Sequence, residues 1–450
     1  MELAARTISM PELEPQTAAE TGTRTLPRFL FDATVIVILL VAGFFGSLFT
    51  QSKIDTRMYE YASGDNAFFQ SDIPRVVEHM TDRKSDHYRI KVHPLFLLAG
   101  WPPVFALEKV LHIEQHRAIQ LTIAAAAAAW LATFYGLLRL SGSRRLDSVI
   151  FTLLLCSSAA AITWTSVPET YLFGSVTLML PLLLLAAAQY RKFGWKSYVV
   201  ASALSMSMTI TNWMSGIIVA AVSLRRRRAV RVTIYSFYLV VTLWGVQQAI
   251  FKNTPFFMDP SLERHFILRS EWGGPLYNFR GAMLYSMVTP AVQAVPLPPD
   301  PGSPLPPRVN FSMFTVQRSS LASAGVVGDA ALAGWVLLLV IGAAGLCFTR
   351  GQTQWRLALG AVILGQIGLH TVYGEESFLY AAHYLPLLIL LAAWGARTKL
   401  RPAVLALAGI VIVLSFYNNG MRFKQLAAGV TAHCDLHWKD VVVRTPPPQG

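Results

Sequence analysis

Apolar runs of roughly membrane-spanning length recur along the chain, separated by short basic turns or by two long polar segments. A helix needs about 20 predominantly apolar residues to cross a bilayer. The expected fold is therefore all-α, a polytopic bundle of transmembrane helices. The runs predict nine spanning helices, at 31–50, 119–138, 148–164, 171–188, 232–251, 330–348, 357–373, 378–394 and 402–417.

A further apolar stretch, 197–224, has basic residues at both ends. Because basic residues favour the cytoplasmic side, both ends of this stretch are expected there, and only a helical hairpin achieves this. Its polar apex falls at 209–213, where irregular backbone is tolerated only if it is buried in protein or lines a cavity. The hairpin brings the expected number of membrane segments to about eleven.

The distribution of basic residues predicts the topology. Short basic clusters lie in the turns near 139–145, 191–196, 225–231, 350–356 and 397–401, which we place in the cytoplasm. The polar segments 51–116 and 252–328 then form outer loops. We divide the chain into a disordered cytoplasmic N-terminus at 1–28, a transmembrane module at 29–417, and a tail outside the cytoplasm at 418–450.

Composition supports a membrane protein and excludes several classes. Of the 450 residues, 54% are apolar and 14% are charged, whereas a soluble domain has about 25% charged residues. Two of the 3 cysteines, Cys156 and Cys347, lie in apolar runs, which argues against a disulfide-stapled fold. The net charge of +13 is explained mainly by the basic turns, so we expect a lipid bilayer and no nucleic acid as partner.

The first outer loop carries two aspartates seven residues apart, Asp65 and Asp72, in the stretch 63–75. Pro74 is expected to start a helix, with Ser71 or Asp72 as its N-cap. The alternative is a carboxylate held at the membrane surface as a general base, which would deprotonate an acceptor hydroxyl. The sequence leaves both interpretations of Asp72 open.

Basic and aromatic residues follow in the same loop. Arg89 and Lys91, with His87, are candidates for binding a lipid phosphate, and a solvent-exposed loop face is the alternative. The apolar stretch 94–107 is too short to span and is expected to form an interfacial helix. Histidines and aspartates near 79–93 match no metal-ligand spacing, so we expect neither a metal nor another cofactor.

Several other polar residues fall at outer ends of the predicted helices. They are Glu169, Glu375 and Glu376, together with His383 and Tyr384 just inside a late helix. A polar residue within a span is a functional candidate, although a histidine at a helix end is often a packed core residue. We take the three glutamates as candidates for orienting a substrate, together with His93, Asn212 and Tyr384.

At this point the pattern resembles the GT-C superfamily of polytopic glycosyltransferases, over about 30–225 and 373–392. The residues that carry the resemblance are the acidic motif Gly64-Asp65 through Ser71-Asp72, the run His93-Pro94-Leu95-Phe96, Arg117 with Tyr135 and Arg144-Arg145, and His383-Tyr384-Leu385-Pro386. Two departures are visible: the family's adjacent acidic pair is absent, and His383 stands where an arginine is common.

The resemblance implies transfer of a sugar from a polyprenyl-phosphate-linked donor to a glycan, lipid or protein acceptor, at the outer face of the plasma membrane. The family's catalytic aspartate corresponds to Asp72 or Asp65, and Asp72 is preferred. Arg89, Lys91, His87 and His383 would contact the donor phosphate, without a metal. Such an enzyme would serve glycan biosynthesis in the cell envelope.

Three other functions remain open. A transporter or lipid flippase would account equally well for many helices, but transport pathways usually place ionisable groups near the bilayer midplane, where this sequence has few. An envelope polysaccharide polymerase or ligase would instead rely on the second outer loop, in particular on Arg264, His265 and Arg269. A non-catalytic scaffold is the third alternative.

Overall fold

The computed structural model describes residues 25–64, 66–258, 266–268, 273–296 and 312–444, and this part of the chain is mainly helical. The helices are α1 (Thr25–Gln51), α2 (Tyr61–Gly64), α3 (Ile73–Thr81), α4 (Phe96–Lys109), α5 (Gln115–Leu140), α6 (Arg145–Cys156), α7 (Ala159–Trp164), α8 (Tyr171–Ala187), α9 (Trp195–Met208), α10 (Trp213–Ser223), α11 (Arg226–Ile250), α12 (Gly274–Arg280), α13 (Gly325–Phe348), α14 (Thr353–Val372), α15 (Ala381–Trp394) and α16 (Arg401–Arg444). Shorter helical segments are η1 (Thr56–Tyr59), η2 (Tyr88–Lys91), η3 (Ile210–Asn212), η6 (Gly281–Tyr285), η7 (Leu321–Ala324), η8 (Ser377–Tyr380) and η9 (Gly395–Arg397). Strands β1 (Gln293–Pro296) and β2 (Ser312–Thr315) form an antiparallel pair.

Seven helical stretches in the described part of the chain are long and apolar enough to cross a membrane, which agrees with a polytopic helical bundle. They are Leu30–Gln51, Gln115–Leu140, Arg226–Ile250, Leu321–Phe348, Thr353–Val372, Ser377–Arg397 and Arg401–Leu436.

The expected helix at 148–164 is interrupted. It divides into α6 and α7 at Ser157 and Ser158, and the Ser158 hydroxyl accepts a hydrogen bond from the Ala161 amide at 3.1 Å, as a helix N-cap does. The amide of Ala159 donates instead to the carbonyl of Met287 at 3.0 Å. Backbone amides at the break are therefore hydrogen-bonded within the protein. The apolar sequence of this stretch did not predict the break.

The stretch 197–224 folds as two helices, α9 and α10, that pack on each other. The Trp213 indole N–H donates to the Ser202 hydroxyl at 3.0 Å across the pair. At the apex the Ile210 amide donates to the carbonyl of Val92 at 3.1 Å, and the Leu95 amide donates to the carbonyl of Ser207 at 2.8 Å. The first polar segment thus packs against the irregular apex, where Thr209 and Asn212 are buried while Thr211 is exposed.

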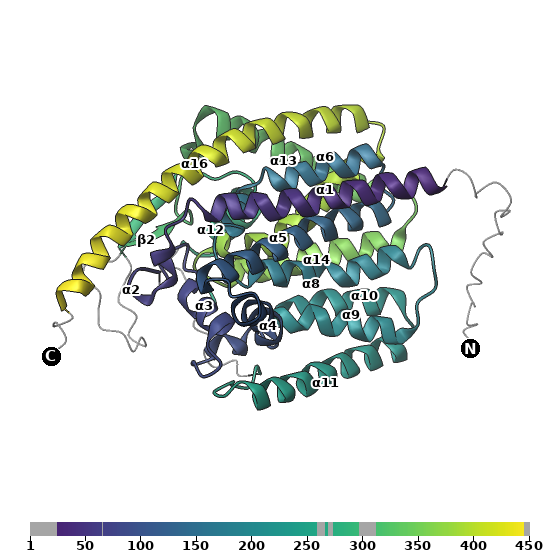
Figure 1. Cartoon of the computed structure of the whole chain (residues 1–450). Helices are drawn as coiled ribbons and strands as arrows, with labels where there is room; N and C mark the ends of the chain where they lie inside the picture. Colours follow the sequence, from purple (N-terminus) through teal and green to yellow (C-terminus); the bar gives the residue numbers. More distant parts are fainter. Residues whose placement is uncertain (1–24, 65, 259–265, 269–272, 297–311, 445–450) are drawn as a thin grey trace.

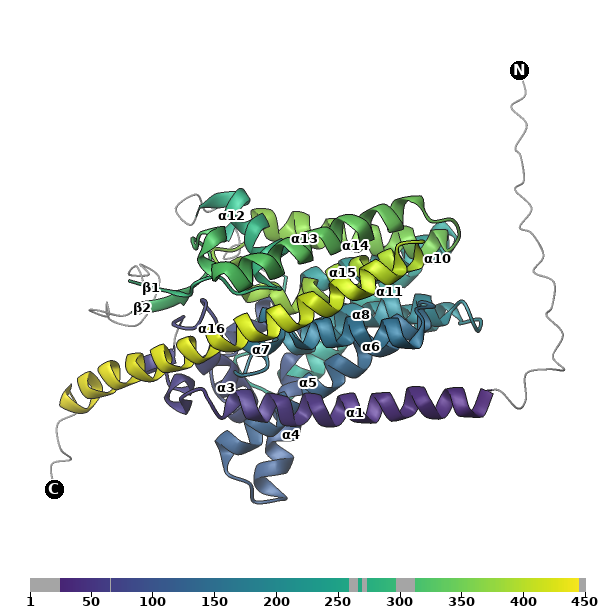
Figure 2. The same cartoon turned by 90° about the horizontal axis from the view of Figure 1, so that it is seen from above.

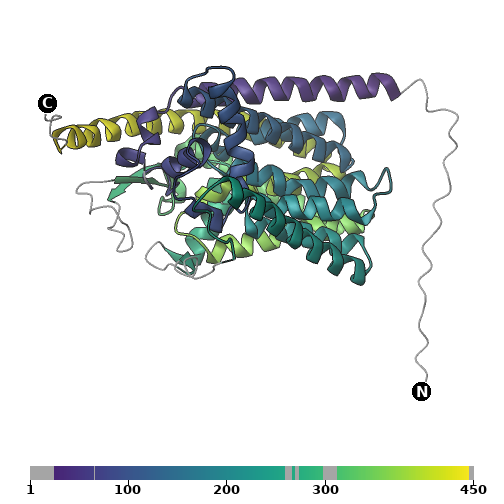
Figure 3. The same cartoon turned by 60° about the horizontal axis from the view of Figure 1, so that its bottom comes forward.

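The two ends of the bundle are formed by different elements (Figures 1 and 3). At one end lie the basic turns, which contact each other: the Gln352 amide nitrogen donates to the carbonyl of Ser141 at 3.3 Å and to Gln189 Oε1 at 3.0 Å. At the other end α2, α3, α12 and the two strands gather. Segments 51–95 and 312–317 meet there, because the Phe314 amide donates to the carbonyl of Ala67 at 2.8 Å.

The last helix does not stop at the expected boundary between residues 417 and 418. α16 continues to Arg444 and reaches well beyond the bundle (Figure 2). Asn419 explains part of this, because its side-chain amide donates to the carbonyls of Ser157 and Met287, both at 2.9 Å. The pair Asn418-Asn419 resembles a helix end in the sequence, but both side chains are buried within the protein. Further along, Asp435 Oδ1 lies 2.8 Å from Arg57 Nη2.

Two other boundaries also differ from expectation. α1 begins at Thr25, within the segment predicted to be disordered, and residues 1–24 lie outside the described part of the chain. The interfacial helix expected at 94–107 is α4, which begins at Phe96, ends at Lys109 and contains Pro102 and Pro103. One face of α4 is buried while Phe105 is exposed on another, a division that suits a helix at the edge of the bundle (Figure 2).

Candidate functional site

Asp72 immediately precedes α3, but its carboxylate does not cap that helix. Its Oδ2 atom lies 2.7 Å from Arg89 Nη1, and its Oδ1 atom lies 3.8 Å from Arg75 Nε. The side chain retains 13% exposure, so it is accessible from outside the protein. Of the two interpretations of Asp72, the structure therefore disfavours simple capping and places a carboxylate among cations.

Arg89, at the centre of the cluster, connects Asp72 to the start of α8. Its Nη2 atom lies 3.8 Å from Glu169 Oε1 and donates to the hydroxyl of Tyr171 at 3.4 Å. Burial alone would lower the pKa of Arg89, but the Asp72 and Glu169 carboxylates raise it well above its ordinary value. Arg89 is therefore a permanent cation held between two acids, and it brings the first polar segment onto the bundle.

Glu169 is the buried acid of this group, with 1% of its side chain exposed. Its Oε2 atom accepts a hydrogen bond from the Thr170 amide at 2.6 Å, whereas Oε1 has no hydrogen-bond donor. Burial raises the pKa of Glu169 to about 7, although Arg89 opposes the shift. The charge of this part of the site therefore changes near neutral pH.

His93 lies next to this group and links it to the hairpin apex. Its Nδ1 donates to the carbonyl of Met208 at 2.6 Å, which leaves Nε2 to accept from the Thr170 hydroxyl at 3.1 Å. Burial, together with nearby Arg89, lowers the pKa of His93 well below its ordinary value. His93 is thus a neutral imidazole with both nitrogens hydrogen-bonded, and it is suited to holding Thr170 and the adjacent Glu169 in position.

Two further cations surround the exposed side of the cluster. Arg75 and Lys91 lie over the ring of Tyr88, with 5.5 Å and 5.0 Å from the guanidinium carbon and Nζ to the ring centroid. Arg75 is not among the residues predicted from the sequence. It lies in the first turn of α3, three residues after Asp72, and this spacing was the signal that could have identified it.

Among the described residues, the contacts of His87 and His383 are with groups other than the Asp72 carboxylate. His87 is buried with its ring 5.2 Å from the ring of His79, and its Nε2 lies 3.3 Å from the carbonyl of Arg83. His383, on α15, packs edge-on against Tyr171 with 5.1 Å between ring centroids. These contacts are those of core packing, and Tyr171 lies between His383 and Arg89 because its hydroxyl accepts from Arg89 while its ring packs on His383.

Asn212 and Tyr384 lie within the bundle. The Asn212 side-chain amide donates to the carbonyl of Gly174 at 3.0 Å and accepts from Gln366 at 3.2 Å. The Tyr384 hydroxyl donates to the carbonyl of Ser377 at 2.9 Å. Both side chains are buried and support neighbouring backbone or side chains.

The adjacent acids Glu375 and Glu376 have different environments. Glu375 is half-buried and its Oε2 accepts from the Gln70 amide at 2.8 Å. Glu376 is fully enclosed: it accepts from the Thr315 hydroxyl and from the Val316 amide at 3.2 Å, and burial raises its pKa to about 7. Glu376 therefore joins η8 to β2, a structural task that its sequence position did not reveal.

Some candidates lie outside the described residues. These are Asp65 and the charged residues Arg264, His265 and Arg269 of the second outer loop. Within the described ranges, no group of three or more His, Cys, Asp or Glu side chains is arranged to hold a metal ion. The chemistry visible around Asp72 is thus that of its accessible carboxylate, the buried acid Glu169 and the cations Arg89, Arg75 and Lys91.

No protein-family model matches the chain, and no curated protein sequence is significantly similar to it.

Proposed function

We propose that the protein is a membrane glycosyltransferase that moves a sugar from a polyprenyl-phosphate-linked donor to an acceptor hydroxyl, with a GT-C-like arrangement of its helices. The observation that carries the proposal is the ion pair of Asp72 and Arg89, with the carboxylate partly accessible and two more cations nearby. A polyprenyl phosphate leaves as an anion, so its departure requires positive charge, and the attacking hydroxyl requires a base.

In this mechanism the acceptor oxygen forms a bond to the anomeric carbon of the sugar while the bond from that carbon to the phosphate oxygen breaks. The hydroxyl proton passes to Asp72, and the electron pair of the broken bond remains on the phosphate. Arg89, Arg75 and Lys91 stabilise the negative charge. Without substrate, Asp72 neutralises Arg89; an arriving phosphate would compete for the guanidinium and release the carboxylate for its role as base.

Glu169 and His93 complete the proposed site as positioning residues. Glu169 contacts Arg89, and His93 contacts the neighbouring Thr170, so both act through the cation and the start of α8. Glu375, half-buried and close to Gln70, is the remaining candidate for binding a sugar hydroxyl.

We further propose a plasma-membrane location with the Asp72 end facing outward. Support comes from the turns at the opposite end, which carry the basic clusters, because such clusters favour the cytoplasmic side. Cysteine labelling of intact cells tests this orientation, with one cysteine introduced at the exposed Lys84 and another at the exposed Arg350, after the native cysteines are replaced.

The activity is tested with purified protein in lipid vesicles, radiolabelled polyprenyl-phosphate sugars and crude envelope acceptors. The proposal predicts transfer of at least one sugar and competition by unlabelled polyprenyl phosphate. Binding of polyprenyl phosphate without transfer across the panel would contradict a transferase.

One observation favours a transporter as the second candidate. Gln366 donates to Asn212 inside the bundle, where His383 is also buried, and Gln366 Oε1 and His383 Nε2 have no hydrogen-bond partner in the described structure. Polar side chains inside a bundle can line a pathway. Substrate flux across proteoliposomes that is unchanged by Asp72→Asn and lost in Asn212→Ala would support transport instead.

A further inference from the structure

A surface groove lies between α10 and the first turns of α11, at the end of the bundle that carries the basic turns. It encloses about 370 Å³ and is lined mainly by Ile217, Ala221, Arg226, Val230, Thr233 and Ile234. The Thr233 hydroxyl already donates to a carbonyl of the preceding turn of α11 at 3.2 Å. The groove therefore offers an apolar wall with one cation, Arg226, at its end.

The apolar wall of the groove faces away from the bundle. Arg226, Val230 and Ile234 are all exposed and are spaced four residues apart, so they lie on one face of α11. Tyr238, also exposed, continues the same stripe. From Val230 to Tyr238 the helix rises about 12 Å, which fits within the depth of one leaflet, about 15 Å. This face therefore has the length and composition of a surface that contacts an acyl chain.

The positive charge at the start of α11 is not neutralised by nearby acids. Arginines occupy positions 225–228 and 231, whereas the whole stretch 170–258 contains no Asp or Glu. Across the described ranges, no carboxylate from elsewhere in the chain lies within 4 Å of these guanidinium groups. The positive end of the α11 dipole adds to their charge. A bound anion would reduce this local excess of positive charge.

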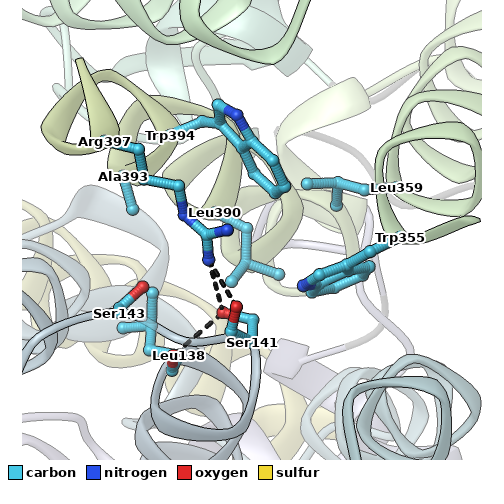
Figure 4. A pocket seen from close by; sticks show the side chains of 9 residues that line it. All are labelled: Leu138, Ser141, Ser143, Trp355, Leu359, Leu390, Ala393, Trp394 and Arg397. Carbon is cyan, nitrogen blue, oxygen red and sulfur yellow. Dashed lines mark hydrogen bonds between the residues drawn. The ribbon is translucent and has the colours of Figure 1, made fainter. Parts of the chain in front are cut away.

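Two other arginines at this end of the bundle are engaged by the protein itself. Arg401 pairs with Asp147 at 2.6 Å. Arg397 donates to the carbonyl of Ser141 at 2.6 Å (Figure 4). These two arginines hold the basic turns together, whereas Arg226 is exposed at the edge of an apolar groove. Arg226 is therefore available to bind a group from outside the chain.

We propose that this groove binds one anionic phospholipid, with an acyl chain along Val230 and Ile234 and the phosphate at Arg226. A guanidinium presents paired N–H donors that match phosphate oxygens, and basic residues at a membrane surface attract anionic lipids. The volume of about 370 Å³ lies within the range of pockets that hold small molecules, about 300–1,000 Å³. The groove is separate from the residues proposed for sugar transfer and does not depend on that proposal.

Native mass spectrometry of the full chain in a neutral detergent tests the proposal, with dioleoyl phosphatidylglycerol and dioleoyl phosphatidylcholine as probes. The two lipids have the same chains and differ in net charge. We expect the first phosphatidylglycerol to bind about tenfold more tightly than phosphatidylcholine. Arg226→Gln should weaken phosphatidylglycerol binding about tenfold and so remove this preference. Ala221→Phe, which fills the groove without changing the charge, should weaken it at least about fivefold.

Two matched controls separate the groove from the rest of α11. Arg231→Gln removes the same charge from an exposed position outside the groove, and Ala249→Phe adds the same ring at an exposed position near the other end of the helix. Each should leave affinity within about twofold. Arg226 and Ala221 are both exposed, and if one variant does not fold, the other decides. Equal affinity for the two lipids, equal loss in Arg226→Gln and Arg231→Gln, or unchanged affinity in Ala221→Phe would each overturn the proposal.

Discussion

The guanidinium of Arg89 lies 2.7 Å from the carboxylate of Asp72, and the same side chain lies 3.8 Å from the buried carboxylate of Glu169. This one arginine therefore joins the loop before α3, the segment η2 and the start of α8. The proposed base, Asp72, therefore lies beside Arg89, the residue proposed to bind phosphate. The ion pair between them holds both side chains in place.

Replacing Arg89 should cost stability as well as activity. Arg89→Gln leaves Glu169 buried without its cation, which is expected to destabilise the protein by about 3 kcal/mol. Arg89→Lys keeps the charge, but its single ammonium cannot replace both the Nη1 contact with Asp72 and the Nη2 contact with Glu169. Its loss of stability should therefore be about 1 kcal/mol. Unfolding in detergent measures both, with Lys84→Gln, an exposed charge in the same segment, as the control. Equal stability of Arg89→Gln and Lys84→Gln would contradict the central position of Arg89.

Glu169 should make stability depend on pH. Its pKa is raised from an ordinary value near 4.5 to about 7, so the folded state favours the protonated form. Its contribution to stability is complete below about pH 4.5 and is lost as the pH rises to about 7, with a total of up to roughly 3 kcal/mol. Glu169→Gln should reduce this decline; Glu376, which titrates in the same range, should account for a remaining part.

Melting temperatures measured from pH 5 to pH 8 test this expectation. Glu60→Gln, a change at an exposed carboxylate, is the control and should keep the wild-type slope. If Glu169→Gln keeps that slope as well, Glu169 is not protonated near neutral pH.

Glu376 should behave as a structural residue. Glu376→Gln replaces a carboxylate oxygen with an amide group that faces backbone N–H donors, and we expect a loss of about 2 kcal/mol. Thr315→Val, which removes one hydroxyl from the same carboxylate, should cost about 1 kcal/mol. Transfer activity per folded molecule should stay within about twofold in both. A stable Glu376→Gln protein without transfer would instead indicate a direct contact with substrate.

The contact between α8 and α15 depends on Gly174. A Cβ atom at this position would collide with His383 Nε2 and lie 3.0 Å from the Thr209 hydroxyl. Gly174→Ala should therefore destabilise the protein by about 2 kcal/mol. Gly136→Ala on α5 is the control, because the added Cβ would lie 3.9 Å from its nearest neighbour, Leu183 Cδ1. This substitution should leave stability unchanged or raise it slightly. His383→Ala should partly restore stability to Gly174→Ala, and the absence of such rescue would exclude this contact as the cause.

Much of the fold follows from local sequence. Apolar runs identify the long helices, and the polar apex at 209–213 identifies the break in the hairpin. Two features depend on distant contacts and could not be predicted. The break between α6 and α7 is stabilised by Met287, and α16 continues through Asn419 because distant carbonyls accept its amide.

The candidate site shows the same division. Asp72 and Arg89 could be selected from their residue types in one loop, but their direct pairing could not. Glu169 and Glu376 look alike in the sequence, yet one contacts Arg89 and the other contacts Thr315 and Val316. Only tertiary structure separates them, because each role is set by a partner remote in the chain.

Transfer by Asp72→Asn, compared with Asp82→Asn, tests the central claim most directly. Asp82 follows α3 as Asp72 precedes it and is exposed, so the two variants lose the same charge from the same helix. With lipid-linked donor and acceptor, we predict that Asp72→Asn retains polyprenyl phosphate binding and loses about 10²–10⁴-fold in transfer rate, whereas Asp82→Asn keeps wild-type activity. Full transfer by a folded Asp72→Asn protein would contradict the assignment of Asp72 as the base.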